Sequence, residues 1–171
     1  MSPEARASSA ALARLLSEIA EDRAGIHKRF LDAEDAKSRL QRDASDAGSQ
    51  ALAAVALHGW YTGIETIFER IARELDGSVP QGERWHRDLL SQMRTDVPGL
   101  RPAVITTDLV APLATLLGFR HFFRHAYAVT FDSEQLARDL ERLLVVAPRV
   151  EACLDEFFSF IRIAMLSLET R

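Results

Sequence analysis

Apolar residues recur along most of this chain at intervals of three, four and seven positions, the pattern of helices with one buried face. The pattern predicts a long first helix over about residues 8–42, with Ser9 as its N-cap. A second helix is expected over about residues 50–76, ending where Asp76-Gly77 supplies a stop signal. A polar stretch over residues 43–49 separates the two helices.

The second half of the chain predicts three more helices. A short one is expected over about residues 84–97, and a fourth over about 108–125, capped by Thr107 or Asp108 with Pro112 tolerated in its first turn. Asp132 is placed to cap a long last helix, bent at Pro148, and three further residues support this start: Gln135 as a capping-box partner, and Phe131 and Leu136 as a hydrophobic staple.

Composition supports a purely helical protein. Glycine (8) and proline (6) are sparse, 47% of residues are hydrophobic, and no run demands a strand. We therefore expect an all-α, antiparallel bundle of four to five helices that forms one domain over residues 1–171.

Charge and targeting signals limit the binding partners and the cellular location that we expect. The net charge of −4 gives no general attraction to nucleic acid, so any RNA contact needs a local basic patch, and no DNA binding is expected. No apolar run is long enough to span a membrane, and the N-terminus lacks the features of a secretory signal. The single cysteine, Cys153, suits a reducing compartment, so a cytoplasmic location is expected.

The sequence lacks the motifs of several kinds of enzyme and metal site. The chain has no glycine-rich phosphate loop, no zinc-type pairing of cysteine or histidine, no di-iron Glu-x-x-His pattern and no Gly-x-Ser-x-Gly. We expect neither a metal nor a cofactor.

One segment, residues 118–127, carries chemistry. It places Arg120, His121, Arg124, His125 and Tyr127 within eight residues, among phenylalanines and an alanine. Arginine grips phosphate oxygens with a planar fork, and histidine transfers protons near neutral pH. Cleavage of RNA without a metal needs these two functions. We expect the apolar residues to anchor the segment in the core while the basic ones converge in a cleft.

The spacing of Arg120, His125 and Tyr127 resembles the R-x4-H-x-Y motif of HepT-like HEPN ribonuclease toxins, and the polar His121 after the arginine suits the broader HEPN pattern. The similarity in helix order covers about residues 50–150. The chain departs from common versions of the family in its long N-terminal helix and in Arg124, where small apolar residues are frequent.

The resemblance implies an HEPN-like fold and a metal-independent endoribonuclease, an RNA hydrolase or transesterase, with Arg120 and His125 as catalytic residues. It also implies a toxin that forms a homodimer with paired motifs at a shared cleft. Tyr127 would be the residue to which a nucleotidyltransferase antitoxin, similar to MntA, attaches AMP to silence the toxin.

Helix geometry constrains this interpretation. At about 100° per residue, His125 lies about 140° from Arg120 around an unbroken helix. Either the helix unwinds near residues 124–126, or the working pair is completed across a two-fold axis.

Other interpretations of these residues stay open. His121 and Arg124 are either RNA contacts or supporting residues, and Glu65 or Glu69 could orient a motif residue from the neighbouring helix. His86 beside Trp85 is expected to be structural, and the aromatic run at 58–61 is expected to pack in the core. For the whole protein, the alternatives are a non-catalytic module that binds a nucleotidyltransferase or nucleotide, and a purely structural helical dimer.

Overall fold

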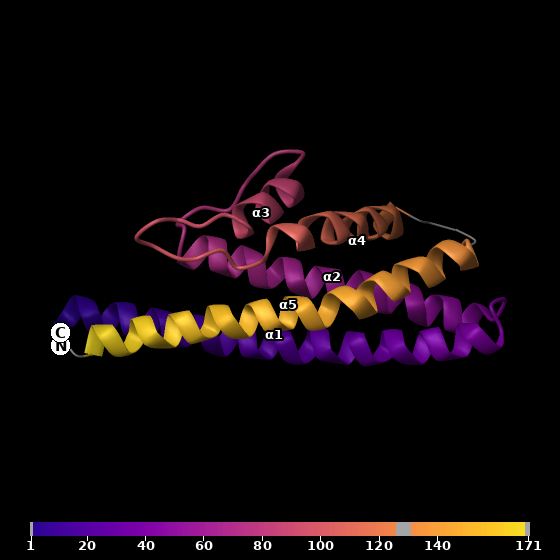
Figure 1. Ribbon diagram of the computed structural model, residues 1–171, viewed down its shortest axis with the longest axis horizontal. Coiled ribbons are helices and arrows are strands. Elements are labelled where there is room, and N and C mark those ends of the chain that lie inside the picture. Colours follow the sequence, from indigo (N-terminus) through magenta and orange to yellow (C-terminus); the bar gives the residue numbers. More distant parts are fainter. Residues whose placement is uncertain (1, 126–130, 170–171) are drawn as a thin grey trace.

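The computed structural model describes the backbone of residues 2–125 and 131–169, and the side chains of these residues except those at 124, 125 and 169. The described chain forms five α-helices and, apart from an isolated bridge between Val97 and Arg101, no β-structure (Figure 1). The predicted all-α, HEPN-like bundle is confirmed. Within the described ranges, no helix is long and apolar enough to cross a membrane.

The first helix, α1 (Pro3–Arg42), begins earlier than predicted. Ser2, and not Ser9, is the N-cap: its hydroxyl accepts a hydrogen bond from the backbone N–H of Ala5 at 3.1 Å. Pro3 at the first helical position and Glu4 in the first turn both favour this start, because proline has no N–H to lose and a carboxylate complements the helix dipole. The predicted boundary at about residue 8 was therefore wrong.

Helix α2 (Ala47–Glu74) is capped by Asp46 and lies close to its predicted range. Helix α3 (Trp85–Met93) is shorter than the expected 84–97. The carbonyl of Met93 accepts hydrogen bonds from the loop N–H groups of Val104, at 2.7 Å, and Ile105, at 3.3 Å. The loop N–H groups therefore satisfy the Met93 carbonyl, which a further turn of α3 would otherwise satisfy.

Helix α4 (Thr107–His125) matches the predicted motif helix, but its start differs in detail. Thr107 is already helical, so neither Thr107 nor Asp108 precedes the helix as a cap, and Pro112 lies beyond the first turn. Asp108 instead pairs with Arg149 of α5.

Helix α5 (Ser133–Glu169) is continuous, with Pro148 in its interior. Its predicted N-cap is confirmed, because the carboxylate of Asp132 accepts from the N–H groups of Glu134 at 2.9 Å and Gln135 at 3.2 Å. The expected reciprocal bond from Gln135 was wrong, since its amide donates forward to Asp139 at 2.9 Å.

The helices form an antiparallel arrangement around one hydrophobic core (Figure 1). Helix α1 runs along α2 and α5, and over the described residues its backbone makes no close approach to α3 or α4. Helices α3 and α4 pack on α2 on the side away from α1, and α4 also contacts α5. Helix α4 is therefore held by three helices, α2, α3 and α5.

The buried face of α4 decides where its arginine lies. Four leucines at helical spacing are at most 2% exposed, and Arg120 continues their stripe at 7%: Leu109, Leu113, Leu116 and Leu117. Arg120 follows Leu113 by seven positions, Leu116 by four and Leu117 by three. It occupies a position that would normally hold an apolar residue.

Helices α1 and α2 approach each other closely at Gly63. A Cβ atom built on Gly63 would lie 2.6 Å from Cγ1 of Ile26. Gly25, one residue before Ile26, has nothing within 4 Å of the same position. A side chain therefore has room at Gly25 but not at Gly63, although both glycines lie inside helices.

We expect Gly63→Ala to lower the free energy of unfolding by about 1 kcal/mol or more, because overpacking costs about 1–3 kcal/mol and outweighs the gain in helix propensity. Gly25→Ala is the matched control, and should raise stability by about 0.5–1 kcal/mol. Urea unfolding followed by circular dichroism measures both. Equal effects of the two substitutions would contradict the close packing.

Candidate active site around Arg120

Arg120 lies between α4, α2 and α3, with its guanidinium turned toward the interior. One Nη donates to Oε2 of Glu65 at 2.8 Å, and the two side chains are only 9% and 4% exposed. Glu65 comes from the middle of α2, where Ile64, Ile67 and Phe68 are all in the core. A carboxylate at that position is stable only with a cation beside it, which Arg120 supplies.

His86, in the first turn of α3, completes the cluster. Its Nδ1 contacts Oε1 of Glu65, the second oxygen of the carboxylate that binds Arg120. Its Nε2 lies 3.5 Å from the other Nη of Arg120. The Glu65 carboxylate thus bridges a histidine and an arginine, and the three groups close a ring of contacts between three helices.

Aromatic contacts hold the His86 ring. The rings of Trp85 and His86 lie 3.7 Å apart between centroids, at an angle of 31°. His121, exposed on α4, meets His86 edge to face at 4.8 Å. His121 therefore lies beside the cluster, at its solvent side.

One donor of the arginine is left over. Nε of Arg120 is buried and has no hydrogen-bond partner among the described residues. An unmatched buried donor costs about 1–3 kcal/mol. The guanidinium therefore retains hydrogen-bonding capacity that Glu65 and His86 do not use.

Tyr61 lies one turn before Glu65 on α2 and is 2% exposed. Burial raises the pKa of its hydroxyl well above the usual range, and the nearby Glu65 carboxylate raises it further, while Arg120 acts in the opposite direction. Tyr61 and the adjacent Trp60 are core residues, as expected for the aromatic run at 58–61. His58 contacts Phe123 of α4, with ring centroids 5.0 Å apart.

The expected arrangement of the motif was partly wrong. Arg120 is buried, whereas Phe122 is 49% exposed, so the basic residue and not the phenylalanine points into the protein. The reason is helical phase: Arg120 continues the leucine stripe of α4, and Phe122 lies on another side of the helix.

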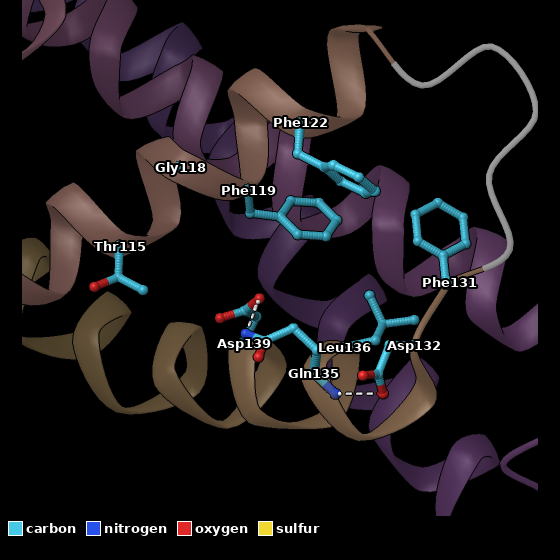
Figure 2. A pocket seen from close by; sticks show the side chains of 9 residues that line it. All are labelled: Thr115, Gly118, Phe119, Phe122, Phe131, Asp132, Gln135, Leu136 and Asp139. Carbon is cyan, nitrogen blue, oxygen red and sulfur yellow. Dashed lines mark hydrogen bonds between the residues drawn. The ribbon is translucent and has the colours of Figure 1, made fainter.

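Phe122 lines a cavity of about 350 Å³ between α4 and the start of α5 (Figure 2). Phe119 and Phe131 form its other aromatic walls, and Gln135 and Asp139 lie on its α5 side. Arg120, Glu65 and His86 are not among the lining residues. The cavity and the arginine cluster are therefore separate features of α4.

The remaining motif residues are only partly described. His125 is the last residue of α4, five positions after Arg120, and the side chains of Arg124 and His125 lie outside the described atoms, as does all of Tyr127. The pairing of Arg120 with His125 stays a prediction.

Of the two glutamates considered as supports, Glu65 contacts Arg120, and Glu69 instead faces Arg73 at 3.8 Å. The sequence predicts a structural role for His86 but not its place beside Arg120. One signal in the sequence could have pointed to this cluster. Arg120 continues the apolar stripe of its helix, and a charged residue at a buried position requires a partner from a neighbouring element. No group of three or more His, Cys, Asp or Glu residues in the described ranges could hold a metal ion.

Comparison with known proteins adds one finding. The sequence model of a family described as "HepT-like protein" matches residues 51–161, which include most of α2, all of α3 and α4, and most of α5. Glu65, His86 and Arg120 all lie within this range, and α1 lies before it. No curated protein and no solved structure matches the chain.

The raised pKa of Tyr61 predicts a loss of stability at alkaline pH. In the unfolded chain the hydroxyl ionises near its ordinary pKa of about 10, while the folded protein keeps it protonated, so its contribution is complete below pH 10 and falls as pH rises above it. Between pH 8 and 11 we expect the wild type to lose about 1.4 kcal/mol more than Tyr61→Phe. Urea unfolding at both pH values measures this, and equal losses would contradict the prediction.

Proposed function

The chain belongs to the HepT-like protein family, and on that premise we propose that it is the toxin of a toxin–antitoxin pair and acts as a metal-independent endoribonuclease. The proposal assigns catalysis to Arg120 and His125 in a single HEPN-type domain over residues 1–171, in the cytoplasm. The observation that carries it is the arginine cluster: within the matched family range, a buried arginine is held by Glu65 and His86, five residues before a histidine.

The proposed reaction is an internal transesterification of RNA. His125 removes the proton of a ribose 2′-hydroxyl or delivers one to the leaving 5′-oxygen. The 2′-oxygen forms a bond to phosphorus as the bond from phosphorus to the 5′-oxygen breaks. The Arg120 guanidinium stabilises the negative charge that builds on the phosphate oxygens.

Helix geometry favours a homodimer for this reaction. Arg120 and His125 lie about 140° apart around a regular helix, and α4 is helical through His125. One α4 cannot aim both side chains at one phosphate. A second copy of the chain, related by a two-fold axis, would bring two motifs to one cleft. His121 and Arg124 are proposed as RNA contacts at its edge.

The proposed control is covalent. A nucleotidyltransferase antitoxin, similar to MntA, would attach AMP to the hydroxyl of Tyr127. A charged nucleotide two residues after His125 would block RNA from the cleft.

One observation favours a second candidate, a non-catalytic module that binds a nucleotidyltransferase or a nucleotide. The charge of Arg120 is already matched by Glu65, and its side chain is only 9% exposed. A cation so placed stabilises the fold whether or not it takes part in chemistry. The two candidates differ in one result, the cleavage of RNA by the purified protein.

We expect the purified wild-type protein to cleave RNA in the presence of EDTA, and His125→Ala to lose at least about 100-fold of this activity, because proton transfer contributes about 10²–10⁴-fold. Arg120→Lys should lose a similar factor, since an ammonium ion lacks the planar fork. Gel analysis of RNA fragments measures both. Wild-type protein that leaves RNA intact would favour the non-catalytic module.

The chain offers a matched control for the loss of a buried arginine. Arg101 is buried with Asp76, and its Nε and one Nη each donate to a different oxygen of that carboxylate at 2.6 Å. Arg101→Lys should lower stability to a similar degree as Arg120→Lys and leave the cleavage rate of the folded protein unchanged.

We expect Tyr127→Phe to cleave RNA like the wild type and to resist AMP attachment when mixed with an MntA-like nucleotidyltransferase and ATP. Mass spectrometry should show an added AMP on the wild type alone, with loss of its cleavage. Modification of Tyr127→Phe to the same extent would contradict the assignment of this tyrosine.

A further inference from the structure

We propose that His86, oriented by Glu65, is a positioning residue that holds the Arg120 guanidinium in its reactive direction. This inference rests on the proposed ribonuclease function and extends the site to α3, which carries none of the motif residues. It concerns how the arginine is held, and assigns His86 no contact with RNA.

The contacts of His86 assign the tautomer of its neutral ring. A carboxylate accepts hydrogen bonds, so the contact with Glu65 places the proton of the neutral ring on Nδ1. Nε2 then carries a lone pair, and this lone pair faces the Nη of Arg120 at 3.5 Å, the long end of the hydrogen-bond range. The histidine thus donates to the carboxylate and offers an acceptor to the arginine.

Two acceptors fix a guanidinium better than one. A single contact with Glu65, at 2.8 Å, leaves the planar group free to turn about that bond. The second acceptor on His86 contacts the other Nη and sets the plane of the group. Glu65 and His86 are both buried, and the Nε donor of the guanidinium stays unpaired among the described residues.

The support for His86 is itself rigid. The Trp85 ring lies against the His86 ring at a tilt of 31°, and the carboxylate of Glu65 is only 4% exposed. A rigid support matters because a displacement of about 1 Å at a reacting group can lower the rate about 100-fold. A histidine held only to stabilise α3 would not need its Nε2 at the arginine.

Three variants separate the two bonds of His86. His86→Phe keeps a ring beside Trp85 and removes both bonds. His86→Asn places an N–H near the position of Nδ1 and keeps only the bond to Glu65. His86→Gln places its amide oxygen near the position of Nε2 and keeps only the acceptor for Arg120. His27→Phe is the control, because His27 lies on α1, where its ring faces Phe30.

The first readout is RNA cleavage by folded protein under saturating and limiting RNA. We expect His86→Phe and His86→Asn to lower kcat about 10- to 100-fold with KM changed less than about threefold, and His86→Gln to recover much of the loss. In the Arg120→Lys background, His86→Phe should add no further loss, because it acts through the arginine. Independent, multiplying losses would overturn the proposal, and so would a rate increase in His86→Phe.

The second readout does not depend on cleavage. In nitrogen-15 spectra of labelled arginine, the Arg120 signals, identified by their absence in Arg120→Lys, should show slow rotation about the Cζ–Nη bonds in the wild type. His86→Phe should speed this rotation, and His27→Phe should not. If the wild type cuts no RNA, the ribonuclease proposal fails while this measurement still decides whether His86 holds Arg120; unchanged rotation in His86→Phe overturns the inference.

Discussion

A charged arginine in the leucine stripe of α4 is the constraint on which the arrangement of the site depends. Arg120 takes an apolar position of its helix, and an isolated buried cation is too costly to be tolerated. Glu65 must therefore face it from α2. Removing one partner from such a buried pair costs about 3–5 kcal/mol, because the other charge is left uncompensated. The pair thus selects one register of α4 against α2.

The same contact prepares the arginine for chemistry. A guanidinium that is held before substrate arrives needs no reorganisation during the reaction, and fixed charges act most strongly where water is excluded. His86 brings α3 into this network through the second oxygen of Glu65. Helix α3 therefore supplies one residue of the cluster. A second buried ion pair, Arg101 with Asp76, holds the loop that follows α3. Arg101 therefore anchors the α3–α4 connection, and Arg120 anchors α4 itself against α2.

Much of the fold could be predicted from local patterns. The 3.6-residue period located the helices, and Asp132 was identified as the cap of α5 because its carboxylate binds N–H groups two and three residues onward. The predicted helix boundaries were wrong where several signals compete or where distant residues decide. Ser9 and Ser2 are both acceptable caps, and Pro3 and Glu4 decide for Ser2. The end of α3 depends on bonds from Val104 and Ile105, eleven and twelve residues beyond Met93, which no local pattern contains.

The sequence by itself determined the helical class and the chemistry of residues 118–127, because periodicity and residue type are local properties. It also contained the phase that buries Arg120, four residues after Leu116 and seven after Leu113. Only the tertiary structure decided which anion meets that arginine. Glu65 and Glu69 lie one turn apart on α2, and packing against α4 brings Glu65 to Arg120 while Glu69 faces Arg73. The place of His86 beside them follows from the docking of α3, since contacts between residues 21 and 34 positions apart leave no periodic trace in a sequence.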